Sequence, residues 1–174
     1  MHLERHQFVA EALFKLGYGK SIQFSTQGLE DFCTNICKSS RVGAVKALIR
    51  NRPDLVEKLT QIAVIGGYTA TLKVLHQENA ITSISSELLD KAIRKKRYYT
   101  IKYIVENGLH ELELRDIVSA AMFGSEKTLL LFVENAPKIT DEQYSKVINI
   151  AKQLGRDASA ETLMKVLYTC DTDL

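Results

Sequence analysis

Apolar side chains recur along the chain at the three- and four-residue spacing that lines one face of an α-helix. Residues 71–75, 100–104 and 128–132 carry this pattern most clearly. Only two prolines, Pro53 and Pro137, interrupt a sequence in which the helix-favouring residues Leu, Ala, Lys and Glu recur. We therefore predict an all-α chain made of short amphipathic helices.

The helical pattern returns at a regular interval, which indicates an internal repeat. Four asparagines follow similar apolar segments and lie 28 residues apart: Asn51, Asn79, Asn107 and Asn135. Within each unit, a first segment ends near an Ala-x-x-x-Gly stretch such as residues 63–67 or 120–124. Alanine lets two helices approach closely, and the glycine permits the positive φ of a tight turn. The second segment then ends at Asn or Gly, residues that tolerate the left-handed conformation.

Each unit is therefore predicted to be a pair of short helices. Thr140 with Gln143 fits a capping box at one helix start, and Ser85 fits an N-cap at another. A pair of this size cannot bury both of its apolar faces alone, so successive pairs should stack. We predict a solenoid of roughly four to five helix pairs over residues 29–174, preceded by a capping helix and a polar linker over residues 1–28.

The units resemble ankyrin repeats. Residues 120–134 follow that family's order of small residues, Gly, a variable stretch and an apolar helix, and residues 106–108, Glu-Asn-Gly, resemble its repeat ending. Lys73 and Lys102 occupy a position where the family often has Lys. The Thr-Pro-Leu-His opening of ankyrin repeats is absent, Lys96 replaces the usual Gly, and the period is about 28 residues instead of about 33.

This resemblance to degenerate ankyrin repeats implies helix pairs whose hairpin fingers are reduced to short loops, such as residues 80–84. It also implies a non-enzymatic module that binds a partner protein on the concave face and on the turns. Degenerate repeats of this sort occur in pathogen effectors and in viral host-interaction proteins. From the resemblance we therefore expect a protein of one of these two kinds.

The composition changes this picture little. Hydrophobic residues make up 45% and charged residues 25%, which is ordinary for a soluble globular chain. The formal net charge of +2 provides no bulk attraction to nucleic acid or to a membrane surface. No stretch approaches the roughly 18 apolar residues of a membrane span, and the first residues lack a signal-peptide core. We expect a cytoplasmic protein without membrane contact, located in the host cytosol if it is a secreted effector.

Chemically active residues are sparse. Cys33 and Cys37 lie four positions apart, which places them on one helix face as small buried side chains, and with Cys170 they form no disulfide framework. The histidines are His2, His6, His76 and His110. The first two form at best a weak metal pair, and the other two fit surface or hydrogen-bonded edge positions. Without a nucleophile–base arrangement or a phosphate-binding loop, we predict no enzymatic activity and no cofactor.

The densest positive charge falls in residues 91–102, at a predicted turn between two helices. This run fits a solvated face, a surface for an acidic protein partner, or a nucleic-acid site whose tyrosines stack on bases. A nuclear-import signal is a less specific alternative, and we rank the acidic protein partner above nucleic acid. The candidate partner-binding residues are Tyr68, Lys91, Arg94, Lys95, Arg97, Tyr98, Met122 and Phe123. For Met122 and Phe123, packing in the core is an equal alternative.

Overall fold

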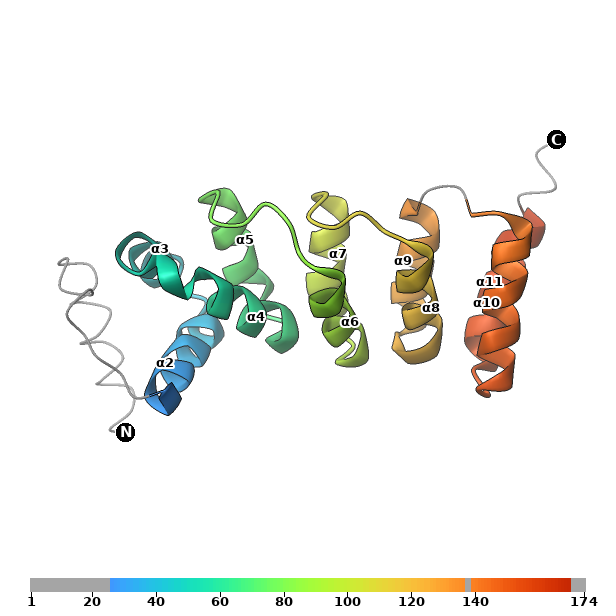
Figure 1. Cartoon of the computed structure of the whole chain (residues 1–174), viewed down its shortest axis with the longest axis horizontal. Helices are drawn as coiled ribbons and strands as arrows, with labels where there is room; N and C mark the ends of the chain where they lie inside the picture. Colours follow the sequence, from blue (N-terminus) through green and yellow to red (C-terminus); the bar gives the residue numbers. More distant parts are fainter. Residues whose placement is uncertain (1–25, 137–138, 170–174) are drawn as a thin grey trace. The chain divides into compact units, whose positions relative to one another are not determined.

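The computed structural model describes residues 26–136 and 139–169 (Figure 1). Among these residues there are ten α-helices, one short 3-10 helix and no β-strand, which confirms the all-α prediction. The chain divides into two compact units, Met1–Thr82 and Ser83–Leu174, and each is described on its own. The helix predicted to cap the repeats falls in residues 1–25, outside the described residues.

Two helix pairs make up the described part of the first unit. Their elements are α2 (Thr26–Ser39), α3 (Val42–Asn51), η2 (Pro53–Leu55), α4 (Val56–Gly66) and α5 (Thr69–Gln77). The first helices of the two pairs, α2 and α4, pack together, as do the second helices, α3 and α5. Leu48, Leu59 and Leu75 are fully buried in their core. Cys33 and Cys37 are buried in the same core, as predicted.

Three helix pairs make up the described part of the second unit, and Figure 1 shows them side by side. Their elements are α6 (Ser86–Arg94), α7 (Tyr98–Glu106), α8 (Leu114–Phe123), α9 (Glu126–Asn135), α10 (Asp141–Gln153) and α11 (Asp157–Thr169). The helix α8 packs against both α6 and α10, and α9 packs against both α7 and α11. Ile104, Phe132 and Leu163, from successive second helices, are fully buried. Within this unit, like helices of neighbouring pairs therefore bury one another's apolar faces.

The predicted helix starts are confirmed. The Ser85 hydroxyl accepts the backbone N–H of Leu88 at 3.3 Å, which caps α6. The Thr140 hydroxyl accepts the N–H of Gln143 at 3.3 Å, and the Gln143 side chain accepts the N–H of Thr140 at 2.9 Å. This reciprocal pair is the capping box expected at the start of α10.

Three of the four repeated asparagines form a side-chain hydrogen bond at the end of a second helix. The amide Nδ2 of Asn51, Asn107 and Asn135 donates to the backbone carbonyl four residues earlier, at 2.8–2.9 Å. These bonds add a side-chain donor to the last turn of each helix, and the carbonyl of Tyr103 also accepts the backbone N–H of Asn107, at 3.2 Å. Left-handed conformation was the predicted reason why the second helices end at Asn. Of the four asparagines, only Asn79 takes it, with φ of 53°.

The turn inside each pair is left-handed in four of the five described pairs. The left-handed residue lies four positions after the Ala of the Ala-x-x-x-Gly stretch, or after the apolar residue that replaces it. The four residues are Ser40, Gly67, Lys96 and Gly155, with φ between 51° and 80°. Gly124 departs from the prediction, because its φ is −71°. A Cβ at Gly124 would lie 2.6 Å from the carbonyl oxygen of Ala120, so glycine is needed there for close approach and not for positive φ.

The connection between α5 and α6 is a loop without a strand. Its residue Ile84 is buried, with 4% of its surface exposed. The Ile84 backbone N–H donates to the carbonyl of Leu109 in the following inter-pair loop, at 2.6 Å. The end of this loop and the loop between α7 and α8 are therefore held together directly.

Candidate functional site

Seven of the eight predicted partner-binding residues belong to the second unit and lie at helix ends. Lys91 and Arg94 are in the last turn of α6, Tyr98 begins α7, and Met122 and Phe123 end α8. Between α6 and α7 the chain carries consecutive cations, and we call Arg94, Lys95, Lys96 and Arg97 the basic turn. All four of its residues are exposed.

Arg94 connects the basic turn to the neighbouring helix pair. Its guanidinium carbon lies 3.7 Å from the centroid of the Phe123 ring, a cation–π contact between α6 and α8. Its Nε donates to Oδ2 of Asp90 at 2.6 Å, and the hydroxyl of Ser119 on α8 donates to the other carboxylate oxygen. The guanidinium is thus held in one orientation while half of the Arg94 side chain stays exposed.

The carboxyl group of Asp90 responds to these neighbours. Partial burial pushes its pKa up, but the hydrogen bonds from Arg94 and Ser119 outweigh burial and leave the pKa below its usual value. Asp90 is therefore ionised at neutral pH and keeps Arg94 in place. Arg94 and Phe123 were both predicted site residues, but the contact between them was not predicted.

The other cations of the run differ in their partners. Lys91 pairs with Glu87 at 2.6 Å and Lys102 with Glu106 at 3.5 Å, both within one helix. Lys95 and Lys96 form no ion pair with any part of the chain that the structure describes. These two ammonium groups are the ones that an incoming anionic group would meet without displacing a carboxylate.

Lys96, which was not among the predicted site residues, occupies a strained backbone position. Its φ is 55°, whereas Gly67 and Gly155 take the same place in two other pairs. A left-handed residue with a Cβ costs roughly 1 kcal/mol relative to the right-handed region. The chain therefore keeps a long cationic side chain where glycine would be the more stable choice.

The start of α7 adds an exposed aromatic ring. Tyr99 is 78% exposed, and its ring packs edge-on against that of Tyr98, with the centroids 5.5 Å apart. The predicted residues Tyr98, Met122 and Phe123 are all partly buried. Met122 and Phe123 are therefore neither fully packed in the core nor fully exposed. Tyr99 was missed, although it lies off the buried stripe formed by Thr100, Ile101 and Ile104, which was a usable signal.

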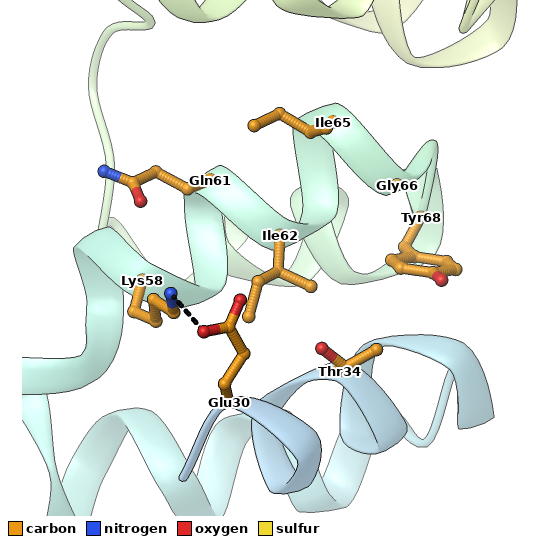
Figure 2. A pocket seen from close by; sticks show the side chains of 8 residues that line it. All are labelled: Glu30, Thr34, Lys58, Gln61, Ile62, Ile65, Gly66 and Tyr68. Atoms are coloured by element: carbon orange, nitrogen blue, oxygen red, sulfur yellow. Dashed lines mark ion pairs between the residues drawn. The ribbon is translucent and has the colours of Figure 1, made fainter. Parts of the chain in front are cut away.

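Tyr68, the eighth predicted residue, belongs to the first unit and lines a pocket of about 260 Å³ between α2 and α4. Figure 2 shows its ring at one end of the pocket and the Glu30–Lys58 ion pair, at 3.2 Å, at the other, with Ile62 between them. A Cβ at Gly66 would come within 2.3 Å of the Tyr68 ring, so this glycine lets the ring pack against the end of α4.

The described residues include no cluster of three or more His, Cys, Asp or Glu side chains that could hold a metal ion. Burial raises the pKa of the Cys33 thiol to about 11 and that of Cys37 to about 12, so both are protonated at neutral pH. The side chain of His110 is only 7% exposed and is hydrogen-bonded at both ring nitrogens. The predicted positions His2, His6 and Cys170 fall outside the described residues.

The chain matches no known protein family, no curated protein and no solved structure. Across the residues that the structure describes, no helix is both long enough and apolar enough to cross a membrane.

Proposed function

We propose that the chain is a non-enzymatic protein-interaction module, a solenoid of degenerate ankyrin-like helix pairs, which binds an acidic protein partner at the basic turn. The observation that carries the proposal is the state of Lys95 and Lys96. Both are exposed and without an ion pair, and Lys96 is kept in a conformation that glycine would adopt more cheaply. Beside them, Arg94 is fixed against Phe123.

Charge complementarity favours a carboxylate-bearing partner for this surface. Unpaired ammonium groups attract an acidic segment over several ångströms and fix its register on contact. Aromatic and Arg side chains such as Tyr99 and Arg94 are the types that commonly anchor protein interfaces. A protein partner therefore fits the mixture of charge and aromatic surface.

A nucleic acid fits the same surface less well. Binding to a phosphate backbone depends on many cations acting together, and its affinity falls steeply with salt. Three cations of the run already have a carboxylate partner, namely Lys91, Arg94 and Lys102. The formal net charge of the chain is only +2.

The proposal is tested by fluorescence anisotropy with a labelled ten-residue glutamate peptide and a labelled oligothymidylate of equal length. The test variant is Lys95→Glu/Lys96→Glu. Its matched control, Lys38→Glu/Lys127→Glu, changes the net charge equally at two exposed lysines elsewhere. We expect the test variant to weaken peptide binding at least about tenfold, or about 1.4 kcal/mol, and the control to weaken it less than about threefold.

Equal losses in the two variants would show that binding follows net charge and not the basic turn, and the proposal would fail. Tighter binding of the oligothymidylate, with a steep dependence on salt and the same loss in the test variant, would assign the surface to nucleic acid instead.

A further inference from the structure

The turns inside the three helix pairs of the second unit lie next to one another. Arg94 of the first turn contacts Phe123 at the second, and Nη2 of Arg156 in the third turn donates to the carbonyl of Gly124 in the second, at 2.9 Å. The packing of α6, α8 and α10 in series agrees with these contacts. We call this line of residues, 94–97, 123–125 and 154–156, the turn row.

The chemistry of the turn row changes from one end to the other. The α6–α7 end is cationic, the partly buried Phe123 occupies the middle, and Leu154 at the α10–α11 end is 52% exposed. Lys95, Phe123 and Leu154 occupy the same position, just before the turn residue, whereas the first unit has Ser39 and Gly66 there. An apolar side chain is therefore not required at this position in order to form the turn.

Leu154 is one of three large hydrophobic residues exposed in the described part of the chain, with Val42 and Tyr99. Carboxylates lie near its end of the row. Asp157 is exposed in the first turn of α11, and Glu126 begins α9, where it accepts the hydroxyl of Thr162. Acidic groups are thus favoured at the basic turn, whereas the Leu154 end, where Lys152 and Arg156 lie beside these carboxylates, has charges of both signs.

We propose, on the basis of the proposed function, that the turn row binds one extended protein segment, with its acidic residues on the basic turn and an apolar side chain on Leu154. Packed helices lie about 8–10 Å apart, so two steps along the row span about 20 Å. An extended chain advances about 3.3 Å per residue, so the acidic group and the apolar anchor are about six residues apart. The partner class is therefore an acidic segment with a leucine-like residue at that distance.

The test uses labelled peptides in which three glutamates and one leucine are separated by a Gly/Ser spacer of two, five or ten residues. Both sequence orders are made, and a matched set has serine in place of the leucine. Dissociation constants are measured by fluorescence anisotropy for the whole chain, for Leu154→Ser and for Val42→Ser. Val42 is a matched control because it is 48% exposed and belongs to the first unit.

We expect the five-residue spacer to give roughly fivefold tighter binding with leucine than with serine, from partial burial of one leucine side chain. Leu154→Ser should abolish this gain and Val42→Ser should keep it, with unchanged helicity by circular dichroism in both. A leucine gain that is absent, insensitive to the spacer or retained in Leu154→Ser would overturn the inference. In each of these cases, loss of the serine peptides' binding in Lys95→Glu/Lys96→Glu would still support the proposed function. No measurable binding of any peptide would overturn both.

Discussion

Replacing His110 with alanine should lower the free energy of unfolding of the second unit by about 3 kcal/mol. Nδ1 of His110 lies 2.9 Å from the carbonyl oxygen of Ile84, and Nε2 lies 2.9 Å from Oδ2 of Asp116. The exposed fractions of the two side chains are only 7% for His110 and 4% for Asp116. The imidazole therefore joins two inter-pair loops to the start of α8, and little of its surface is exposed.

The magnitude follows from what the alanine leaves behind. A hydrogen bond to a charged group contributes about 1.5–3 kcal/mol and a neutral one about 0.5–1.5 kcal/mol, so the bonds of His110 to Asp116 and Ile84 together account for about 3 kcal/mol. Asp116 would keep one donor, because its Oδ2 also accepts the backbone N–H of Glu113 at 2.9 Å. Because this bond keeps the carboxylate partly satisfied, we expect no loss beyond about 3 kcal/mol.

The assay is equilibrium urea unfolding of the whole chain, followed by circular dichroism. His76→Ala is the control, because His76 is only partly buried in α5 of the first unit, and it should change the unfolding free energy by less than about 1 kcal/mol. A double-mutant cycle with Asp116→Ala should show a coupling of about 1–3 kcal/mol between His110 and Asp116. A loss below 1 kcal/mol for His110→Ala, or strictly additive effects in the cycle, would refute this reasoning.

Three further outcomes are expected. Lys96→Gly should raise the unfolding free energy by about 1 kcal/mol by relieving the left-handed φ of 55°, while it weakens binding of the glutamate peptide. Asn135→Ala should lower thermal stability by about 0.5–1 kcal/mol, because it removes the 2.8 Å bond to the carbonyl of Leu131, and an unchanged melting temperature would contradict the capping role. The raised pKa values of Cys33 and Cys37, about 11 and about 12, mean that the unfolded chain releases thiol protons first. The stability of the first unit should therefore fall as the pH rises from about 9 towards 12, and unfolding titrations that stay flat over this range would speak against buried thiols.

The features predicted correctly from the sequence depend on residues close together in the chain. The capping box of Thr140 and Gln143 needs only four consecutive positions, and the apolar stripe of each helix needs only its own spacing. The end of the second helices at Asn was also predicted, but for an incomplete reason. Three of the asparagines bond back into the last helical turn through their side-chain amides, and sequence alone does not distinguish this arrangement from a left-handed residue.

Gly124 shows where a repeat alignment misleads. In three other pairs, the residue after the left-handed turn donates its N–H to the carbonyl of the repeat's alanine, as Arg97 does to Ala92. Ser125 occupies that place after Gly124, and its hydroxyl instead caps α9 by accepting the N–H of Thr128 at 3.3 Å. The Ser125 backbone is fully extended, with ψ of 158°, whereas ψ is 70° for Tyr68 and 58° for Arg97 at the same place in two other pairs. The serine was visible in the sequence and could have predicted the exception.

The contacts of the site between residues far apart in the chain could not be predicted from the sequence. Arg94 meets Phe123 and His110 meets Ile84 across neighbouring helix pairs. A repeat period indicates which helices face each other, because each pair must bury its apolar stripe against the next. It does not indicate which polar side chains meet at the edges, since those contacts depend on the displacement between pairs and on rotamers. Candidate residues could therefore be named, but not their partners.

At position 96, the residue that favours stability differs from the residue that favours the proposed binding role. Other left-handed turns of this kind use Ser40, Gly67 and Gly155, which are small, and only here in the described chain does a long charged side chain take the position. Local and global preferences usually agree in a folded sequence, and conflicts gather at functional sites. If the basic turn were merely a solvated face, glycine at position 96 would stabilise the chain without any effect on binding. If it is a binding surface, the same substitution gains stability and loses affinity together, and only that joint result fits the proposal.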